Sequence, residues 1–397
     1  MTYCVNRNIN YTNVCTLACT FCAFSKGPSA EELRGKPYLL SLDEVARRTR
    51  EAWDRGANEV CMQGGIHPSF TGEDYLEILR AAKRGAPEMH VHAFSPLEVT
   101  HGAKTLGLSI SDYLVALKAE GLGSLPGTAA EVLHDDVRAK ICPDKLTSEE
   151  WLRVVSTAHA VGIPTTSTMM FGHVDADGPD AWARHLLELR RVHVSSASRS
   201  HRKRESDSMD TDTAAASRRH TSVATSANHP ATFTEFVPLP FVHFEAPAFR
   251  AGDARRGPTL RECILVHAVA RLTLGPAGVK NVQASWVKMG PEMASLLLEC
   301  GCNDLGGTLM NESITRAAGG DRGQEFGPQV RSIQTFFTHR PVSTLDRVGP
   351  FQLTGEPFLN PGTTLRGWRR RYGGRSGRRG CGRRCTRTWG RGGARWR

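Results

Sequence analysis

The chain lacks several features that would place it in a membrane or outside the cell. No apolar run reaches the length of about eighteen residues that a membrane-spanning helix needs, so we expect no membrane contact. Nothing at the N-terminus has the pattern of a signal peptide, and the eleven cysteines do not form regularly spaced pairs. The sequence therefore excludes a disulfide-stapled secreted protein and favours a reducing compartment, with the cytoplasm as the expected location.

Acidic residues are missing from the end of the chain. None follows Glu356, whereas residues 366–397 include thirteen arginines, more than the net charge of +11 of the whole chain. The remainder is slightly acidic and lacks the basic surface that nucleic-acid-binding proteins show. We predict that the Gly/Arg-rich residues 331–397 form a disordered tail. Nucleic acid is not the expected partner, although arginine- and glycine-rich segments can bind RNA.

Strand and helix patterns alternate along residues 1–330. This alternation predicts an α/β protein with a parallel sheet, and seven or eight repeats favour a (β/α) TIM-type barrel over an open sheet. Residues 194–230 lack apolar periodicity and are rich in Ser, Thr, Arg and His, so we predict a disordered internal insertion there. The predicted strands are 8–15, 59–65, 89–95, 123–127, 166–172, 233–241, 281–286 and, more weakly, 302–307.

Three cysteines stand close together in the run CTLACTFCAF. The spacing of Cys15, Cys19 and Cys22 suits three irons of a four-iron, four-sulfur cluster and leaves the fourth iron open to a small molecule. Structural zinc usually needs four ligands in two close pairs, and no second Cys/His pair follows within thirty residues. Disulfides between such near neighbours would close small, strained loops. The pattern therefore predicts a metal cluster.

Polar and glycine residues at predicted strands are further candidates. Gln63, Gly64 and Gly65 end the second strand, where missing side chains let a ligand approach the backbone, although a plain turn is the alternative. His90 and His92 alternate on the third strand and therefore face the same way. Two inward imidazoles need polar partners, which favours contact with a substrate, while outward positions remain possible.

Two more polar side chains follow predicted strands. Ser95 comes directly after the third strand, and Glu131 lies in the run PGTAAE after the fourth. A carboxylate at Glu131 can accept hydrogen bonds from ribose hydroxyls or a substrate amine. The alternative is an ordinary glutamate at a helix N-terminus, where the helix dipole favours negative charge.

The cysteine run, with Phe21 just before its third cysteine, resembles the signature of the radical S-adenosylmethionine (SAM) superfamily. Beyond that, the chain resembles the second module of FO synthase, the family of 5-amino-6-(D-ribitylamino)uracil–L-tyrosine 4-hydroxyphenyl transferases. The likeness covers about residues 5–320 except 194–230. It rests on the runs NRNINYTNVC, CMQGGIHP, MHVHAFSPLE, LPGTAAEVL, TSTMMFGHVD, FTEFVPLPFVH, QASWVKMG and GCNDLGGTL, in that order.

This resemblance implies cofactors, residue roles and a reaction. The cofactors are a four-iron, four-sulfur (4Fe-4S) cluster and S-adenosylmethionine, whose cleavage gives a 5′-deoxyadenosyl radical. The radical activates L-tyrosine, and the 4-hydroxybenzyl unit joins the diaminouracil, a step toward the deazaflavin precursor FO. Further expected partners are an electron donor of the flavodoxin or ferredoxin type and the other FO synthase module. The implied cluster ligands are Cys15, Cys19 and Cys22; the cofactor-binding candidates are Phe21, Gln63, Gly64, Gly65, Ser95 and Glu131; the catalytic candidates are His90, His92 and Glu131.

Two other functions remain open at this level. A menaquinone-pathway radical SAM enzyme, such as an aminofutalosine synthase or the related cyclase, would share the barrel and the cysteine run. A non-catalytic iron–sulfur protein that binds RNA through its arginine tail would share only the cluster, and it would show no SAM cleavage.

Overall fold

The computed structural model describes residues 1–26, 36–212, 231–308, 310–321 and 325, with the backbone alone over 200–212. The chain divides into a unit of residues 1–359 and a second unit of residues 360–397. The second unit and the predicted tail over residues 331–397 lie outside the described residues.

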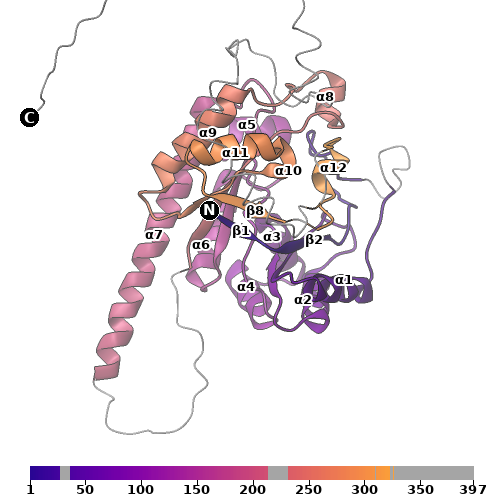
Figure 1. Ribbon diagram of the computed structural model, residues 1–397. Coiled ribbons are helices and arrows are strands. Elements are labelled where there is room, and N and C mark those ends of the chain that lie inside the picture. The colour runs from indigo at the N-terminus through magenta and orange to yellow at the C-terminus, as the bar shows by residue number, and fades with distance from the viewer. Residues whose placement is uncertain (27–35, 213–230, 309, 322–324, 326–397) are drawn as a thin grey trace, which may run out of the picture. The chain divides into compact units, whose positions relative to one another are not determined.

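The described strands pair in parallel, as the sequence predicted (Figure 1). They form sheets of order β1-β8, β2-β3-β4 and β5-β6-β7. Isolated parallel bridges connect neighbouring sheets, such as Arg7 with Met310, Leu125 with Thr165, and Gln283 with Asp304. The strands are β1 (Thr2–Cys4), β2 (Asn6–Asn10), β3 (Glu59–Gln63), β4 (His90–Ala93), β5 (Thr165–Phe171), β6 (Phe233–Pro240), β7 (Asn281–Val282) and β8 (Asp304–Gly307).

Three predicted strands differ from the structure. The one predicted over 281–286 is a strand only over Asn281–Val282, and Trp286 begins a helix. The first ends at Asn10 and does not reach residue 15, because the chain leaves the sheet there to form the cysteine loop. The predicted strand over 123–127 contributes only the bridges of Ser124 and Leu125. Its pairing stops where Pro126 offers no backbone N–H, and Gly127 donates instead to the Thr166 hydroxyl, at 2.9 Å.

Helices surround the strands in Figure 1 and cover their apolar face. In β3, Val60 and Met62 are buried in the core below α1 and α2, while Glu59 and Cys61 face the other side. The helices are α1 (Leu42–Asp54), α2 (Gly72–Gly85), α3 (Pro96–Thr105), α4 (Ile110–Ala119), α5 (Asp135–Ile141), α6 (Ser148–Ala160), α7 (Pro179–Asp212), α8 (Pro247–Ala251), α9 (Leu260–Leu274), α10 (Trp286–Met289), α11 (Pro291–Glu299) and α12 (Ile314–Ala317).

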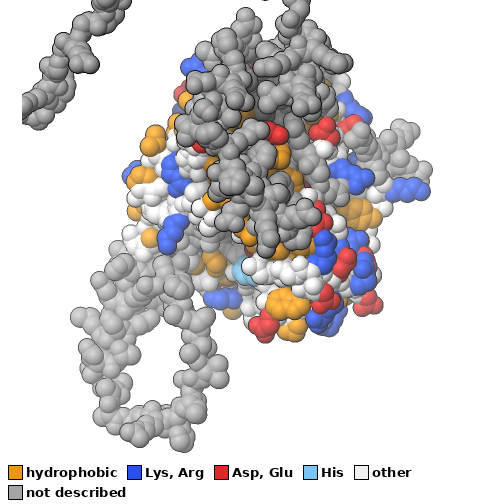
Figure 2. All heavy atoms as spheres, in the orientation of Figure 1, with side chains coloured by type: hydrophobic (Ala, Val, Ile, Leu, Met, Phe, Trp, Pro, Cys, Tyr) orange, Lys and Arg blue, Asp and Glu red, His pale blue; other side chains and the backbone are white. Residues whose placement is uncertain are grey.

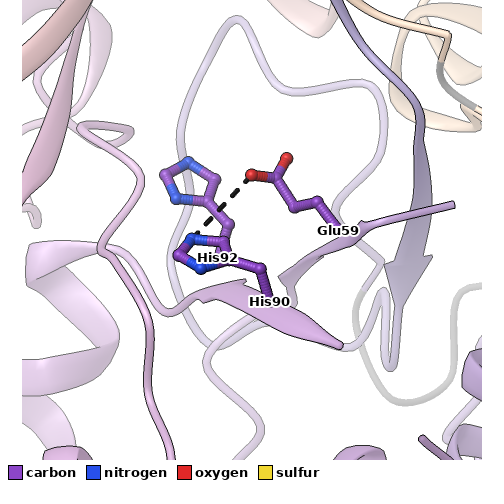
Figure 3. Close-up of side chains that lie close together, drawn as sticks. All are labelled: Glu59, His90 and His92. Atoms are coloured by element: carbon purple, nitrogen blue, oxygen red, sulfur yellow. Dashed lines mark ion pairs between the residues drawn. The ribbon is translucent and has the colours of Figure 1, made fainter. Parts of the chain in front are cut away.

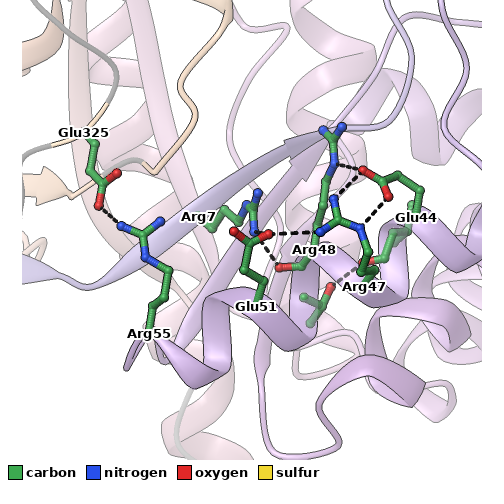
Figure 4. A network of polar contacts seen from close by, with 9 residues as sticks. Arg7, Glu44, Arg47, Arg48, Glu51, Arg55 and Glu325 are labelled. Atoms are coloured by element: carbon green, nitrogen blue, oxygen red, sulfur yellow. Dashed lines mark hydrogen bonds and ion pairs between the residues drawn. The ribbon is translucent and has the colours of Figure 1, made fainter.

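A buried arginine holds the first helix against the sheet (Figure 4). The guanidinium of Arg7 on β2 donates to the backbone oxygen of Arg48, at 3.0 Å, and to the carboxylate of Glu51, at 2.9 Å. Both acceptors lie on α1, whose N-terminus is capped by the Ser41 hydroxyl. The contact fixes α1 behind the strand that leads into the cysteine loop.

The predicted insertion over 194–230 is partly wrong. Helix α7 continues to Asp212, so residues 194–212 are helical, and residues 213–230 lie outside the described residues. No Gly or Pro interrupts that stretch, and Ser196 is buried where its hydroxyl contacts Nδ1 of His159, at 2.9 Å. One buried turn thus extends the helix through a sequence without apolar periodicity.

The described helices and surface have two further features. None of the helices that the structure describes is long and apolar enough to cross a membrane. On the face shown in Figure 2, acidic and basic side chains are interspersed over α1 and α2.

Candidate functional site

The three cysteines of the N-terminal run lie in one loop beyond the carboxyl end of β2. The loop is tied to the body by backbone hydrogen bonds from Cys15 to the oxygen of Lys26, at 3.1 Å, and from Thr16 to that of Ile66, at 2.9 Å. Backbone N–H groups of Ile66 and Ser25 donate to the sulfurs of Cys15 and Cys22, each at 3.3 Å. Such donors stabilise the negative charge of thiolates that bind metal.

The arrangement fits a multi-iron cluster better than a single ion. All three cysteines are free thiols. In the part of the chain that the structure describes, their sulfurs do not form a group whose atoms all lie within 4.8 Å of one another. The sulfur ligands of one tetrahedral zinc would lie about 3.8 Å apart. Burial raises the pKa of Cys19 to about 12, so iron must displace its proton on binding.

The glycines after β3 pack against the cysteine loop. A Cβ atom on Gly64 would lie 2.3 Å from the ring of Tyr11, and one on Gly65 would lie 2.2 Å from the backbone oxygen of Val14. Gly65 also donates its N–H to the oxygen of Thr12, at 3.1 Å. Only glycine allows the end of β3 to approach the loop this closely.

A buried carboxylate holds this glycine turn in place. Glu98 accepts the Gly64 N–H at Oε1, at 3.1 Å, together with the hydroxyl of Tyr11. At Oε2 it accepts the backbone N–H and the hydroxyl of Ser95, at 2.7 and 2.6 Å. Burial raises the pKa of Glu98, which these hydrogen bonds partly oppose. Ser95 is therefore the N-cap of α3 and shares Glu98 with the glycine turn.

An ion pair lies on the other side of the cysteine loop. Lys145 Nζ is 2.7 Å from Oε1 of Glu131 and 5.1 Å from the centre of the Phe21 ring. Burial would raise the pKa of Glu131, but Lys145 outweighs that effect and holds the pKa below its usual range. Glu131 also has a left-handed backbone, with φ of 46°. The negative charge of Glu131 is thus compensated by Lys145 beside the cysteine loop.

Of the two histidines of β4, His90 lies at the opposite end of the strands, whereas His92 is two residues further along, in register with Cys61. Residue His90 begins β4 and pairs in register with Glu59, the first residue of β3. The glycine turn follows β3 five residues later, ~16 Å along an extended strand. The rings of His90 and His92 both contact the hydroxyl of Ser124, at 2.8 and 2.7 Å. Burial lowers the pKa of His92, which favours its neutral form.

The structure therefore separates the predicted site residues into two groups. Beside the cysteines it gathers Phe21, Gly64 and Glu131, with Ser95 acting through Glu98. The histidines form the second group with Glu59. Sequence reasoning missed Lys145 and Glu59 as site residues. The alternation Glu-x-Cys-x-Gln in β3 was the available signal for Glu59, since it repeats the His-x-His pattern of β4.

Comparisons with known proteins identify the superfamily of the chain. Residues 9–185 match the radical SAM superfamily, and residues 230–337 match the CofH/MqnC C-terminal region. A solved structure of methylornithine synthase has the same fold, with a TM-score of 0.55 and 14% identity, over 87% of this chain and 85% of that one. The fold and the cysteine loop thus define a radical SAM protein, and this superfamily uses a four-iron, four-sulfur cluster and SAM.

Proteins of similar sequence identify the family within this superfamily. The 5-amino-6-(D-ribitylamino)uracil–L-tyrosine 4-hydroxyphenyl transferase of Methanopyrus kandleri is 45% identical over 329 residues, which cover 83% of this chain and 78% of the relative. The FO synthase of Streptomyces coelicolor is 48% identical over 323 residues, 81% of this chain but only 32% of the relative. The chain belongs to the family of 5-amino-6-(D-ribitylamino)uracil–L-tyrosine 4-hydroxyphenyl transferases and spans about a third of the FO synthases it matches.

Proposed function

We propose that the chain transfers the 4-hydroxybenzyl group of L-tyrosine to 5-amino-6-(D-ribitylamino)uracil, a step in the biosynthesis of FO. The relative from Methanopyrus kandleri, named for this transfer and matched over most of both chains, is the observation that carries the proposal. When bound, the cluster and SAM supply the radical that activates tyrosine. The chain's own residues bind, orient and protect the reactants.

We assign a separate role to each group of residues beside the cysteine loop. Cys15, Cys19 and Cys22 hold the cluster, and the backbone at Gln63–Gly65 receives the amino group of SAM. Support comes from the glycine turn, which packs against Val14 and the Cys15 side chain and is held by Glu98. Phe21 covers the cluster loop from the side of Lys145.

Polar side chains on both sides of the site hold the substrates and the cofactor. Glu131, kept ionised by Lys145, accepts hydrogen bonds from ribose hydroxyls or from a substrate amine. At the other end of the strands, His90 and His92 hold the polar part of a substrate that reaches from the cluster along the strands. Their shared contact with Ser124 fixes both rings for this task.

We further propose that the three sheets close into one barrel around this site. Support comes from the parallel bridges that follow one another from sheet to sheet, of which Arg7 with Met310 joins the last strand region to β2. The barrel would exclude water from a carbon radical that abstracts hydrogen from almost any neighbour. A crystal structure would check closure through continuous hydrogen bonding between residues 6–10 and 304–310.

The proposed partners follow from the same chemistry. An electron donor of the flavodoxin or ferredoxin type reduces the cluster, and the other FO synthase module uses the product. Free thiols at the described cysteines suit a reducing compartment such as the cytoplasm.

The decisive experiment is an anaerobic assay of the reconstituted chain with SAM, a reductant, L-tyrosine and the diaminouracil. We expect deoxyadenosine to form far faster with tyrosine than with phenylalanine, because sites that hydrogen-bond a hydroxyl reject the analogue without it by ~10⁴–10⁵. Mass spectrometry should find a 4-hydroxybenzyl adduct. The variant His92→Ala should lower adduct yield more than uncoupled SAM cleavage. Turnover of aminofutalosine-pathway substrates in place of tyrosine would refute the proposed substrates.

A further inference from the structure

Three side chains with metal-binding atoms meet where β3 and β4 begin. One ligand atom each from Glu59, His90 and His92 lies within 4.8 Å of the other two. They form the one such group of three His, Cys, Asp or Glu side chains among the described residues. In Figure 3 the carboxylate of Glu59 and the ring of His90 face each other, with the ring of His92 beside them.

The backbone brings these side chains together without strain. Glu59 and His90 are neighbours in the parallel register of β3 and β4, and strands in a sheet lie about 4.8 Å apart. His92 comes two residues after His90, so its side chain leaves the same face of β4. The group is therefore a consequence of register and alternation, with each ligand on a strand.

Neighbouring polar groups orient all three side chains. The Asn6 amide donates to Oε1 of Glu59, at 3.1 Å, which leaves Oε2 facing His90, 4.0 Å from its Nε2. The Ser124 hydroxyl lies 2.7 Å from Nδ1 of His92 and 2.8 Å from Nε2 of His90, and a bound ion would replace it at Nε2 of His90, the nitrogen that faces Glu59. Metal ligands in proteins are oriented by hydrogen bonds of this kind.

The Glu59 carboxylate is mostly buried, with 20% of its side chain exposed. Burial of carboxylates is unfavourable unless a positive charge or hydrogen bonds compensate it. The contact between Glu59 and His90 gives little compensation, since at 4.0 Å a half-exposed pair contributes only ~0–1 kcal/mol. A bound cation would compensate this carboxylate directly.

We propose that Glu59, His90 and His92 bind one divalent transition-metal ion, with zinc as the expected ion. Two imidazoles and one carboxylate form a familiar donor set for such ions and leave a coordination position open. The ligand atoms of a tetrahedral zinc lie about 3.4 Å apart, so small rotations of the three side chains would complete the site. The His90 side chain is 44% exposed, which gives the ion a path from solvent.

The open coordination position adds a way for the histidines to bind the substrate through the ion. It would take an oxygen atom of the substrate at the end of the strands opposite the cysteine loop, and this part of the inference rests on the proposed function. The ion itself would bind without substrate. Its presence can therefore be tested separately from the reaction.

Elemental analysis of the reconstituted, desalted protein tests the metal site. We expect about one zinc per chain beside the irons of the cluster, with iron and zinc lost independently. Replacing Cys15, Cys19 and Cys22 together by Ala should remove the iron and keep the zinc. The double variant His90→Ala/His92→Ala should lose the zinc and keep the iron, whereas His134→Ala, outside the group, should keep both.

A milder variant and a spectroscopic probe guard against misfolding. Glu59→Gln keeps the side-chain volume, and we expect at least tenfold weaker zinc binding with unchanged cluster absorption and circular dichroism. Cobalt(II) in place of zinc should give the visible absorption of a four- or five-coordinate site, and the histidine variants should lack it. Zinc that stays in the histidine double variant, or leaves only with the cysteines, would overturn the metal site. Neither result depends on whether tyrosine is the substrate.

Discussion

Replacing Gly65 by Ala tests whether the glycine turn and the cysteine loop form one site. The new Cβ would lie 2.2 Å from the Val14 backbone oxygen and 2.8 Å from Cβ of Cys15, whereas real contacts almost never fall below 3.0 Å. The loop must therefore move by about 0.8 Å. Overpacking of this kind costs ~1–3 kcal/mol, and a shift of about 1 Å in a reacting geometry can cost ~10²-fold in rate.

We therefore expect Gly65→Ala to lower the free energy of unfolding by about 1–3 kcal/mol and SAM cleavage by ~10- to 100-fold. Denaturant unfolding, iron content and deoxyadenosine formation measure the three effects. Gly178→Ala is the matched control, because its added Cβ would meet only the Asp175 oxygen, at 3.9 Å. If Gly65→Ala kept full iron, near-normal cleavage and the stability of the control, the packing argument would be refuted.

Three further predictions concern single side chains. Cys19→Ala should abolish SAM cleavage and lower the iron content, while the buried Cys263→Ala should keep the cluster. Lys145→Met leaves the Glu131 carboxylate buried without its partner and should lower the free energy of unfolding by ~3–5 kcal/mol at pH 7. Because the pair depresses the pKa of Glu131, this loss of stability should fade when unfolding is measured below about pH 4.5. The pKa of Glu235 is about 8 in the folded chain, against 4.5 in the unfolded chain. As pH rises from about 4.5 to 8, the metal-free wild-type protein should therefore lose up to ~5 kcal/mol of stability relative to Glu235→Gln.

Local patterns predicted much of the scaffold. The alternation of strand and helix patterns predicted the parallel pairing of the strands, because each pattern depends on residues close together in the chain. The spacing of the three cysteines likewise predicted a metal loop, and the structure places that loop directly after β2. The prediction of a disordered insertion from residue 194 was wrong for a non-local reason. Helix α7 continues past that residue with a tertiary contact of Ser196, which no local pattern reveals.

The supporting residues of the site depend on contacts between distant segments. Glu98 reaches Gly64 across 34 positions, and Lys145 reaches Glu131 from the far side of α5. Parallel register alone decides that Glu59 lies opposite His90. Sequence periodicity gives the face on which each residue lies but not the register, so it predicted the histidines as site residues and missed their carboxylate neighbour.

The proposed roles divide the chemistry along the strands. A radical needs close packing around its source, and the cysteine loop meets this need through Gly64 and Gly65, where backbone fills the space that side chains would occupy. Recognition of a polar substrate needs hydrogen-bonding groups held in fixed directions, and His90 and His92 are so held by Ser124. Because Glu59, in register with His90, stands five residues before Gly64, a substrate held at His90 would present its other end to the radical. The strand length would then set which atom reacts.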